Sequence, residues 1–230
     1  MRESLQAVIL AGGKGTRLGK LGNKIPKAMV NIDGKPFLDI LISQLKKTGI
    51  KKFLILTGYK KEIIINNFQN NKNIQIHKGK TNWKILTRLI KAKKLIKQNF
   101  LLMYCDNYLI NYDLSKQINL VKKKKSTIIF SIIQKKAGQK GTILEKKQKK
   151  IYYKKGIMSN LAEAGYMFIN KKFFFKNINE EKNKRDLSDY LHFLSKRFDL
   201  YGINFKKKFL CVENQYLLNK TRKYFKENKY

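Results

Sequence analysis

The chain has 230 residues, of which 43% are hydrophobic, and a formal net charge of +37. This size suits one domain with a substantial core, and no run of about 18 apolar residues is present that could form a membrane-spanning helix. The start, Met1-Arg-Glu-Ser4, lacks the apolar segment of a signal peptide, and Cys105 and Cys211 provide no disulfide framework, so we expect a cytoplasmic protein.

The positive charge has two interpretations. It suits a protein that binds nucleic acid, an anionic membrane surface or an anionic substrate. However, Lys, Asn, Ile, Tyr and Phe are all abundant and share A/T-rich codons, and the lysines are spread along the chain in runs such as Lys122–Lys125. We therefore favour compositional drift, and nucleic acid is not the expected partner.

Strand and helix patterns alternate through the first half of the chain. The expected strands are Gln6–Leu10, Phe53–Thr57, Ile74–His77, Phe100–Tyr104 and Thr127–Ile133, and the expected helices are Pro36–Thr48, Glu62–Phe68, Leu86–Ile96 and Leu114–Val121. This alternation predicts an α/β fold with a mostly parallel sheet that is covered on both faces. The helix at Leu86–Ile96 has a strongly basic face, on which Arg88 is either a surface cation or a phosphate contact.

The pattern changes from about residue 135. We expect an antiparallel ribbon at Gly141–Lys155, strands at Tyr166–Ile169 and Leu200–Phe205, and helices at Leu187–Lys196 and Tyr216–Lys226. Asp186 or Ser188 is placed to cap the first of these helices. Because no linker rich in Pro, Gly or Ser divides the chain, we predict a single domain over residues 1–230, with halves of about 1–134 and about 135–230.

A glycine-rich loop follows the first expected strand. It reads Val8-Ile-Leu-Ala-Gly-Gly-Lys-Gly-Thr-Arg-Leu18, and Pro26-Lys-Ala-Met29 comes soon after it. Glycines leave backbone N–H groups uncovered, and N–H groups with fixed cations make a cradle for a polyphosphate. The loop lacks the third glycine of G-x-G-x-x-G and is not a G-x-x-x-x-G-K-[ST] loop. The sequence therefore predicts nucleotide binding outside these two common patterns.

The string Leu10-Ala-Gly-Gly-x-Gly-Thr-Arg-Leu18 with Pro26-Lys-x-Met29 resembles the signature of the sugar-1-phosphate nucleotidyltransferases. The resemblance implies a Rossmann-like three-layer sandwich and an enzyme that joins an NTP to a sugar 1-phosphate, forming an NDP-sugar and releasing pyrophosphate. Within this family the chain resembles heptose-1-phosphate guanylyltransferases and glucose-1-phosphate cytidylyltransferases, which implies a role in bacterial surface polysaccharide synthesis.

The resemblance also implies roles for single residues. Arg17 would hold the leaving pyrophosphate, and Lys27 would offset charge at the α-phosphate. The other expected nucleotide-binding residues supply mainly backbone groups or line the base pocket: Leu10, Ala11, Gly12, Gly13, Gly15, Thr16, Thr81 and Thr87. The stretch Lys80–Leu89 lacks two glycines of the cytidylyltransferase pattern, so CTP, GTP and UTP all stay open. Trp83 in this stretch is expected to pack in the core.

The family binds Mg²⁺, and the resemblance points to two carboxylates. Asp106 ends the strand Phe100–Tyr104 at the position of the metal-binding Asp, and Glu213 fits the second position, with Asn214 as the alternative. If both assignments hold, Cys105 and Cys211 lie near one another.

The sugar side of the site is less clear from the sequence. Glu163 and Gly165 fit the strand that faces the sugar in this family, and Lys154 lies near the position that contacts the sugar phosphate. His77 and His192 have no metal-spaced partners and are expected to be packing or surface residues.

Two alternative functions remain open at this point. One is a related enzyme that acts on phosphocholine. The other is a basic nucleic-acid or membrane-surface binder on a degenerate transferase scaffold, motivated by the charge of +37. Self-association into a homodimer is also left open.

Overall fold

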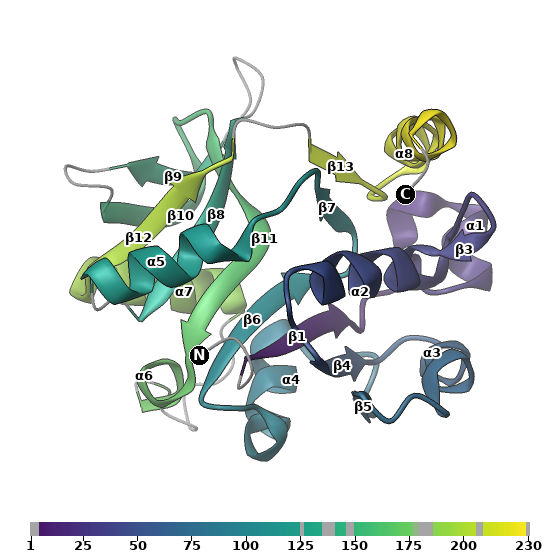
Figure 1. Cartoon of the computed structure of the whole chain (residues 1–230), viewed down its shortest axis with the longest axis horizontal. Helices are drawn as coiled ribbons and strands as arrows, with labels where there is room; N and C mark the ends of the chain where they lie inside the picture. The colour runs from purple at the N-terminus through teal and green to yellow at the C-terminus, as the bar shows by residue number, and fades with distance from the viewer. Residues whose placement is uncertain are drawn as a thin grey trace.

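Figure 1 shows a computed structural model of the chain, which describes residues 5–124, 127–134, 141–145, 150–176, 178, 186–205 and 209–228. Within these residues nine strands form one sheet, in the order β5-β4-β1-β6-β11-β8-β12-β10-β9. The strands are β1 (Gln6–Ala11), β4 (Lys52–Thr57), β5 (Ile74–His77), β6 (Asn99–Tyr104), β8 (Ile128–Gln134), β9 (Gly141–Glu145), β10 (Lys150–Ile157), β11 (Leu161–Asn170) and β12 (Leu200–Asn204).

The sheet is parallel in one half and mixed in the other. Strands β5, β4, β1 and β6 pair in parallel throughout, as expected from the alternation of strands and helices. Beyond β6, strand β11 is antiparallel to both of its main neighbours, and only β8 and β12 pair in parallel. The chain reaches β11 from β8 through the antiparallel ribbon of β9 and β10 rather than through a helical crossover, which explains the change of direction.

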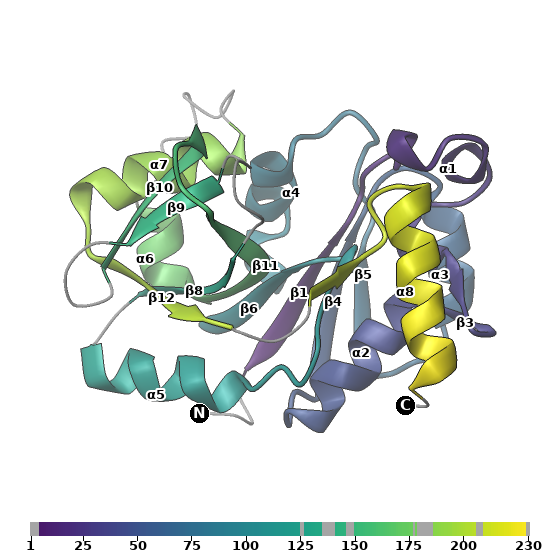
Figure 2. The same cartoon turned by 90° about the horizontal axis from the view of Figure 1, so that it is seen from above.

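Helices cover both faces of the sheet, which gives the three layers seen in Figure 2. One face carries α2 (Phe37–Lys47), α3 (Lys61–Phe68), α5 (Leu114–Lys124) and α8 (Gln215–Glu227), and the other carries α4 (Ile85–Lys91), α6 (Lys171–Lys176) and α7 (Leu187–Arg197). In β1, Ala7 and Ile9 join the core under the first face, whereas Val8 and Leu10 join the core under the second. Strands buried on both sides read as unbroken apolar runs, which is why the sequence revealed them.

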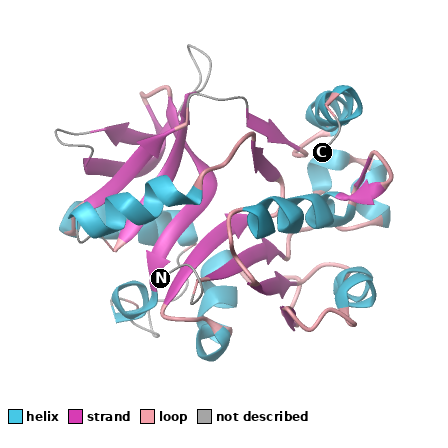
Figure 3. Cartoon of the chain, viewed as in Figure 1, coloured by secondary structure: helices cyan, strands magenta, loops and turns pink. Residues whose placement is uncertain are grey.

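Several short elements near the site were absent from the sequence prediction (Figure 3). They are α1 (Lys20–Lys24), the hairpin of β2 (Asn31–Ile32) and β3 (Lys35–Pro36), the antiparallel pair of β7 (Asn107–Leu109) and β13 (Phe209–Cys211), and 3-10 turns at Thr16–Leu18, Lys27–Met29 and Lys93–Leu95. The expected helix Leu86–Ile96 is split, because α4 ends at Lys91 and the turn at Lys93–Leu95 follows it.

Asp186 is the cap of α7. Its side chain accepts a hydrogen bond from the backbone N–H of Leu187, and Asp189 completes a capping box. Of the two caps proposed from the sequence, Asp186 is therefore the one used. Among all described helices, none combines the length and the apolar character that crossing a bilayer requires.

Candidate functional site

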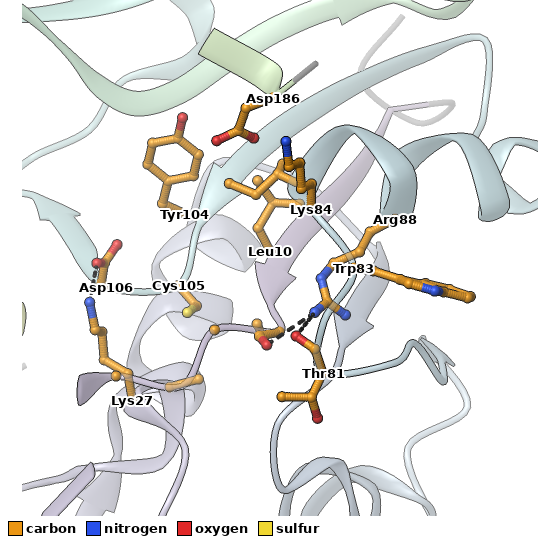
Figure 4. Close-up of a pocket in the computed structure, with 16 residues that line it drawn as sticks. Leu10, Lys27, Thr81, Trp83, Lys84, Arg88, Tyr104, Cys105, Asp106 and Asp186 are labelled. Atoms are coloured by element: carbon orange, nitrogen blue, oxygen red, sulfur yellow. Dashed lines mark hydrogen bonds and ion pairs between the residues drawn. The ribbon is translucent and has the colours of Figure 1, made fainter. Parts of the chain in front are cut away.

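The candidate site lies at the carboxyl edge of the parallel half of the sheet. Ala11 at the end of β1 pairs with Thr57 at the end of β4, and Leu10 pairs with Tyr104 at the end of β6. Because parallel strands end at the same edge, the segments that follow them gather there. A cavity of about 370 Å³ opens at this edge (Figure 4), and its lining includes eight of the predicted residues: Leu10, Ala11, Gly12, Gly13, Gly15, Lys27, Thr81 and Asp106.

Local backbone geometry brings the two halves of the loop motif together. Gly15 has a φ of +65°, in the left-handed region that favours glycine, and the chain continues into the 3-10 turn at Thr16–Leu18. A second turn, which begins after Pro26, carries Lys27 back against the loop. A Cβ atom on Gly15 would lie 3.3 Å from Cβ of Lys27, so the loop and this cation are in close contact.

Each predicted phosphate-binding cation forms an ion pair with a predicted metal ligand. Nζ of Lys27 lies 2.9 Å from Oδ2 of Asp106, and the two side chains are 18% and 22% exposed. Arg17 pairs with Glu213 at the surface, where the side chains are 68% and 40% exposed. A surface pair of this kind contributes roughly 0–1 kcal/mol to stability, so an incoming ligand can separate it at little cost.

The antiparallel pair of β7 and β13 brings together the backbone segments that carry the two carboxylates. Cys211 pairs with Asn107, and the backbone N–H of Val212 donates to the carbonyl of Asp106 over 3.0 Å. Asn214, the alternative ligand, uses its side-chain oxygen to cap α8 by accepting from the N–H of Leu217. Of the two candidates, Glu213 is the one whose side-chain oxygen is not used to cap a helix, although it is paired with Arg17.

The donor set of the site fits a magnesium ion. Among the described residues no group of three or more His, Cys, Asp and Glu side chains could hold a metal. Mg²⁺ is commonly held by only one or two carboxylates, with substrate phosphates and water completing its coordination. Asp106 and Glu213 would satisfy that requirement.

Both cysteines lie close to this carboxylate pair. The charges of Asp106 and Lys27 act on the thiols of both Cys105 and Cys211, which places the two residues in one neighbourhood, as the sequence suggested. Burial, with a further contribution from Asp106, raises the pKa of Cys105 to about 12 and that of Cys211 to about 11. Both thiols are therefore neutral and unreactive at neutral pH.

Glu163 is a partly buried carboxyl group beside the cavity. The backbone N–H of Gly165 donates to its Oε2 over 2.7 Å, and the hydroxyl of Tyr104, a cavity residue, also donates to it. Desolvation raises the pKa of Glu163 from its usual value of 4.5 to about 7, and the charge of Asp106 adds to this effect. The group therefore titrates near neutral pH.

The backbone conformation of β11 requires a glycine at position 165. Its φ is +78°, and a Cβ atom there would lie 2.7 Å from both Nδ2 of Asn107 and the ring of Tyr104. The pairing of β11 with β8 shifts register between Glu163 and Met167, so the glycine forms part of an irregularity that turns Glu163 toward Tyr104.

The remaining predicted residues lie outside the cavity lining. Thr16 and Arg17 are exposed on the first 3-10 turn, Thr87 is half-buried on α4, and Lys154 is exposed on β10. Their sequence-based roles stay predictions.

Arg88 departs from one of its two sequence-based interpretations, because it is buried and not a surface cation. The other interpretation, a phosphate contact, stays a prediction, since Arg88 is part of the cavity lining. Its side chain is buried, and its guanidinium donates to the backbone carbonyls of Gly12, Thr57 and Thr81. The helical spacing that placed Arg88 on a basic face could not indicate that three carbonyls from distant segments converge on it.

Other cavity residues were missed or misjudged. Trp83 is half-buried, lies beside His77 and lines the cavity, instead of packing in the core. Lys84, Tyr104 and Asp186 also line the cavity. Tyr104 could have been found, since it stands two residues before Asp106 at the end of a buried strand. His192 packs as expected, with Nδ1 2.7 Å from the carbonyl of Tyr153.

Comparison with known proteins agrees with this geometry. The UTP–glucose-1-phosphate uridylyltransferase AglF of Haloferax volcanii is 34% identical over 131 residues, which cover 56% of this chain and 54% of that protein. The D-glycero-alpha-D-manno-heptose 1-phosphate guanylyltransferase of Aneurinibacillus thermoaerophilus is 30% identical over 209 residues, covering 86% of this chain and 88% of that protein. The chain spans about half the length of several curated relatives that it matches.

The fold of the chain is similar to that of solved nucleotidyltransferases. The structure of the CTP:phosphocholine cytidylyltransferase of Streptococcus pneumoniae superposes with a TM-score of 0.80 at 18% identity, covering 96% of this chain and 99% of that one. A model of the nucleotidyl transferase family matches residues 6–192, which include the glycine loop, Lys27, Asp106 and Glu163. The chain therefore belongs to the nucleotidyl transferase family.

Proposed function

We propose that the chain transfers a nucleotidyl group from an NTP to a sugar 1-phosphate, forming an NDP-sugar and releasing pyrophosphate. The observation that carries this proposal is the convergence of the glycine loop, Lys27 and Asp106 on one cavity at the carboxyl edge of the parallel strands. The relatives' names support the reaction class, since they act on sugar 1-phosphates.

The residues on the nucleotide side would position and neutralise rather than form covalent bonds. The N–H groups of Gly12, Gly13 and Gly15 would hold the triphosphate along the loop. Lys27 would exchange its contact with Asp106 for the α-phosphate, where negative charge develops as the sugar phosphate oxygen attacks. Arg17 would likewise leave Glu213 and hold the departing pyrophosphate.

Asp106 and Glu213 would hold Mg²⁺ once these cations have moved to the phosphates. When bound, the ion would supply positive charge that offsets the charge of the phosphates. The chain's own contribution is to keep two carboxylates on adjacent backbone segments that the β7–β13 pairing fixes.

The sugar side of the site is assigned to the second half of the chain. Glu163 would accept hydrogen bonds from sugar hydroxyls, and Gly165 would hold its carboxyl group in place through the N–H that it donates. Lys154, exposed on β10, would meet the sugar phosphate. A homodimer and a role in surface polysaccharide synthesis belong to the same proposal.

The base pocket does not select one nucleotide. Thr81, Trp83, Lys84 and Ile85 line that side of the cavity and offer a hydroxyl group, an indole ring and an ammonium group. The ammonium group could donate to a carbonyl oxygen of uracil, guanine or cytosine alike. UTP, GTP and CTP are therefore all candidates, and the relatives' names already include a uridylyl and a guanylyl transfer.

A two-step experiment tests the proposal. The first step measures thermal shifts with ATP, CTP, GTP and UTP in the presence of Mg²⁺, where a nucleotide at a hundred times its dissociation constant stabilises by about 2.7 kcal/mol. The second step measures pyrophosphate release with the best nucleotide and a panel of sugar 1-phosphates, with phosphocholine as a separate arm. We expect turnover with a sugar 1-phosphate.

Two outcomes would replace the proposal. Turnover with phosphocholine alone would move the chain to the phosphocholine branch, whose solved relative has the same fold. No turnover with any nucleotide, combined with tight and salt-dependent retention on DNA or RNA, would favour the basic binder suggested by the charge of +37.

A further inference from the structure

Arg88 is a buried cation that the proposed chemistry leaves without a role. It is 3% exposed, and its guanidinium donates to the carbonyls of Thr57 over 2.5 Å, Gly12 over 3.2 Å and Thr81 over 3.2 Å. These carbonyls belong to the end of β4, the glycine loop and the segment before α4. Figure 4 shows Arg88 among the residues that line the cavity, with its guanidinium beside Thr81.

Among the residues that the structure describes, the charge of Arg88 has no carboxylate partner. Within the described parts of the chain, no Asp or Glu oxygen lies within 4.0 Å of it, and its polar contacts are to carbonyl oxygens. A buried charge is costly unless it is well hydrogen-bonded. The planar fork of donors in arginine suits three converging carbonyls, whereas a lysine ammonium could not reach all of them.

Three glycines make room for this guanidinium. A Cβ atom on Gly12, Gly58 or Gly79 would come closer than 3.0 Å to atoms of Arg88. None of the three has a positive φ, so backbone conformation does not require glycine at these positions. At Gly58 and Gly79 a Cβ atom would also come within 3.0 Å of a backbone carbonyl oxygen, that of Gly12 or Thr57, so the guanidinium is one of two obstacles there. At Gly12 the three nearest atoms all belong to Arg88.

The carbonyl of Gly12 links Arg88 to the ligand side of the loop. It accepts from Nη2 of Arg88 and also from the backbone N–H of Tyr59, both over 3.2 Å. In a planar trans peptide the carbonyl of one residue and the N–H of the next point in opposite directions. Two donors on the Gly12 carbonyl therefore turn the N–H of Gly13 away from Arg88. Gly13 lines the cavity, and a Cβ atom there would meet nothing within 4 Å.

We propose that Arg88 is a positioning residue, which fixes the Gly12–Gly13 peptide so that the N–H of Gly13 faces the bound triphosphate. This inference rests on the proposed nucleotide binding and adds a residue that orients the backbone of the phosphate-binding loop. Arg88 contacts no substrate atom in this account. It acts through one peptide group, and the three glycines act by admitting its side chain.

The binding test compares a ligand with phosphates and one without. Dissociation constants are measured for the best-binding NTP with Mg²⁺ and for the corresponding nucleoside, in the wild type, Arg88→Lys and Lys91→Met. Lys91 is exposed on the same helix and is the matched control. We expect Arg88→Lys to weaken NTP binding about tenfold more than nucleoside binding, since a hydrogen bond to a charged group is at stake. Lys91→Met should change neither constant.

The outcomes distinguish a failure of the positioning role of Arg88 from a failure of the proposed nucleotide binding. If Arg88→Lys weakens the NTP and the nucleoside by the same factor, Arg88 has only a general structural role and the inference is wrong. If the wild type itself binds no nucleotide, the proposed function fails first and the inference falls with it.

A folding test checks the packing without any ligand. Gly12→Ala is measured by thermal unfolding in the wild type and in Arg88→Met, whose shorter side chain leaves the space open. We expect Gly12→Ala to lower the midpoint by roughly 5 °C in the wild type and by much less in Arg88→Met. Equal shifts in the two backgrounds would show that the glycine is not there for the guanidinium, and would overturn the inference.

Discussion

On the parallel half of the sheet, a glycine loop forms part of the cavity lining, and the buried Arg88 holds one of its carbonyl groups. On the mixed half, the group proposed to meet the sugar is a single side chain, Glu163, which accepts from the cavity residue Tyr104 and whose pKa is raised by burial to about 7. A backbone cradle suits phosphates, which every NTP shares. A titratable side chain suits the hydroxyl groups that distinguish one sugar from another. The two halves should therefore respond to mutation and pH in different ways.

The largest effect is expected on the parallel half, at Lys27. Lys27→Ala should lower kcat by about 100- to 1,000-fold, because it removes a cation placed where charge develops in the transition state. Steady-state pyrophosphate release measures this loss. Lys24→Ala is the control, since Lys24 is an exposed lysine of the neighbouring helix α1. An equal loss in both variants would mean that general positive charge, and not the position of Lys27, supports the reaction.

A pH-dependent effect is expected on the mixed half, at Glu163. Its pKa is raised in the folded state, so the unfolded chain loses the proton first as pH rises. The unfolding free energy of the wild type, relative to Glu163→Gln, should therefore fall by about 3 kcal/mol between pH 4.5 and pH 7. Urea denaturation at several pH values measures this difference. A constant difference across that range would show that the carboxyl group is not perturbed.

A smaller effect is expected at Gly13, and it isolates the backbone cradle. Gly13→Ala adds a methyl group where the protein leaves open space, so its stability should stay within about 0.5 kcal/mol of the wild type. NTP binding should weaken about tenfold, because the methyl group intrudes on the cavity. Calorimetric titration measures the NTP affinity, and urea denaturation measures the stability. Unchanged NTP affinity would place the triphosphate elsewhere.

The smallest effect is expected at the two candidates for the second metal position. Asn214→Ala should cost about 1 kcal/mol of stability through loss of the cap of α8, without changing the Mg²⁺ concentration needed for half-maximal activity. Glu213→Ala should raise that Mg²⁺ concentration and leave stability nearly unchanged. A reversal of these two results would make Asn214 the ligand.

The sequence predicted which residues of the parallel half lie together, for a physical reason. The glycine loop and Asp106 directly follow buried strands, and parallel strands bring their carboxyl ends together, whereas Lys27 reaches the same edge through the turn after Pro26. Contacts that depend on tertiary packing could not be predicted from the sequence. The contacts of Arg88 depend on three carbonyls that converge only after folding, and the approach of the segment before Glu213 to Asp106 depends on the short pairing of β7 and β13.

On the mixed half, the full length of strand β11 could not be predicted from the sequence either. The apolar pattern predicted only Tyr166–Ile169, whereas the strand runs from Leu161 to Asn170. The left-handed backbone at Gly165 and the register shift around it interrupt the alternation that a sequence pattern relies on. The same irregularity orients Glu163, so the feature that hid the strand is also the one that shapes the site.

The paired charges have a consequence for how ligands enter. Lys27 with Asp106, and Arg17 with Glu213, make four charges that sum to zero in a chain of net charge +37. A purely anionic ligand that binds both side-chain cations leaves the two carboxylates without partners. A metal cation that binds the two carboxylates alone leaves the two side-chain cations without partners. Each ligand therefore lowers the cost of admitting the other. By thermodynamic linkage, nucleotide and divalent cation should bind with positive heterotropic cooperativity.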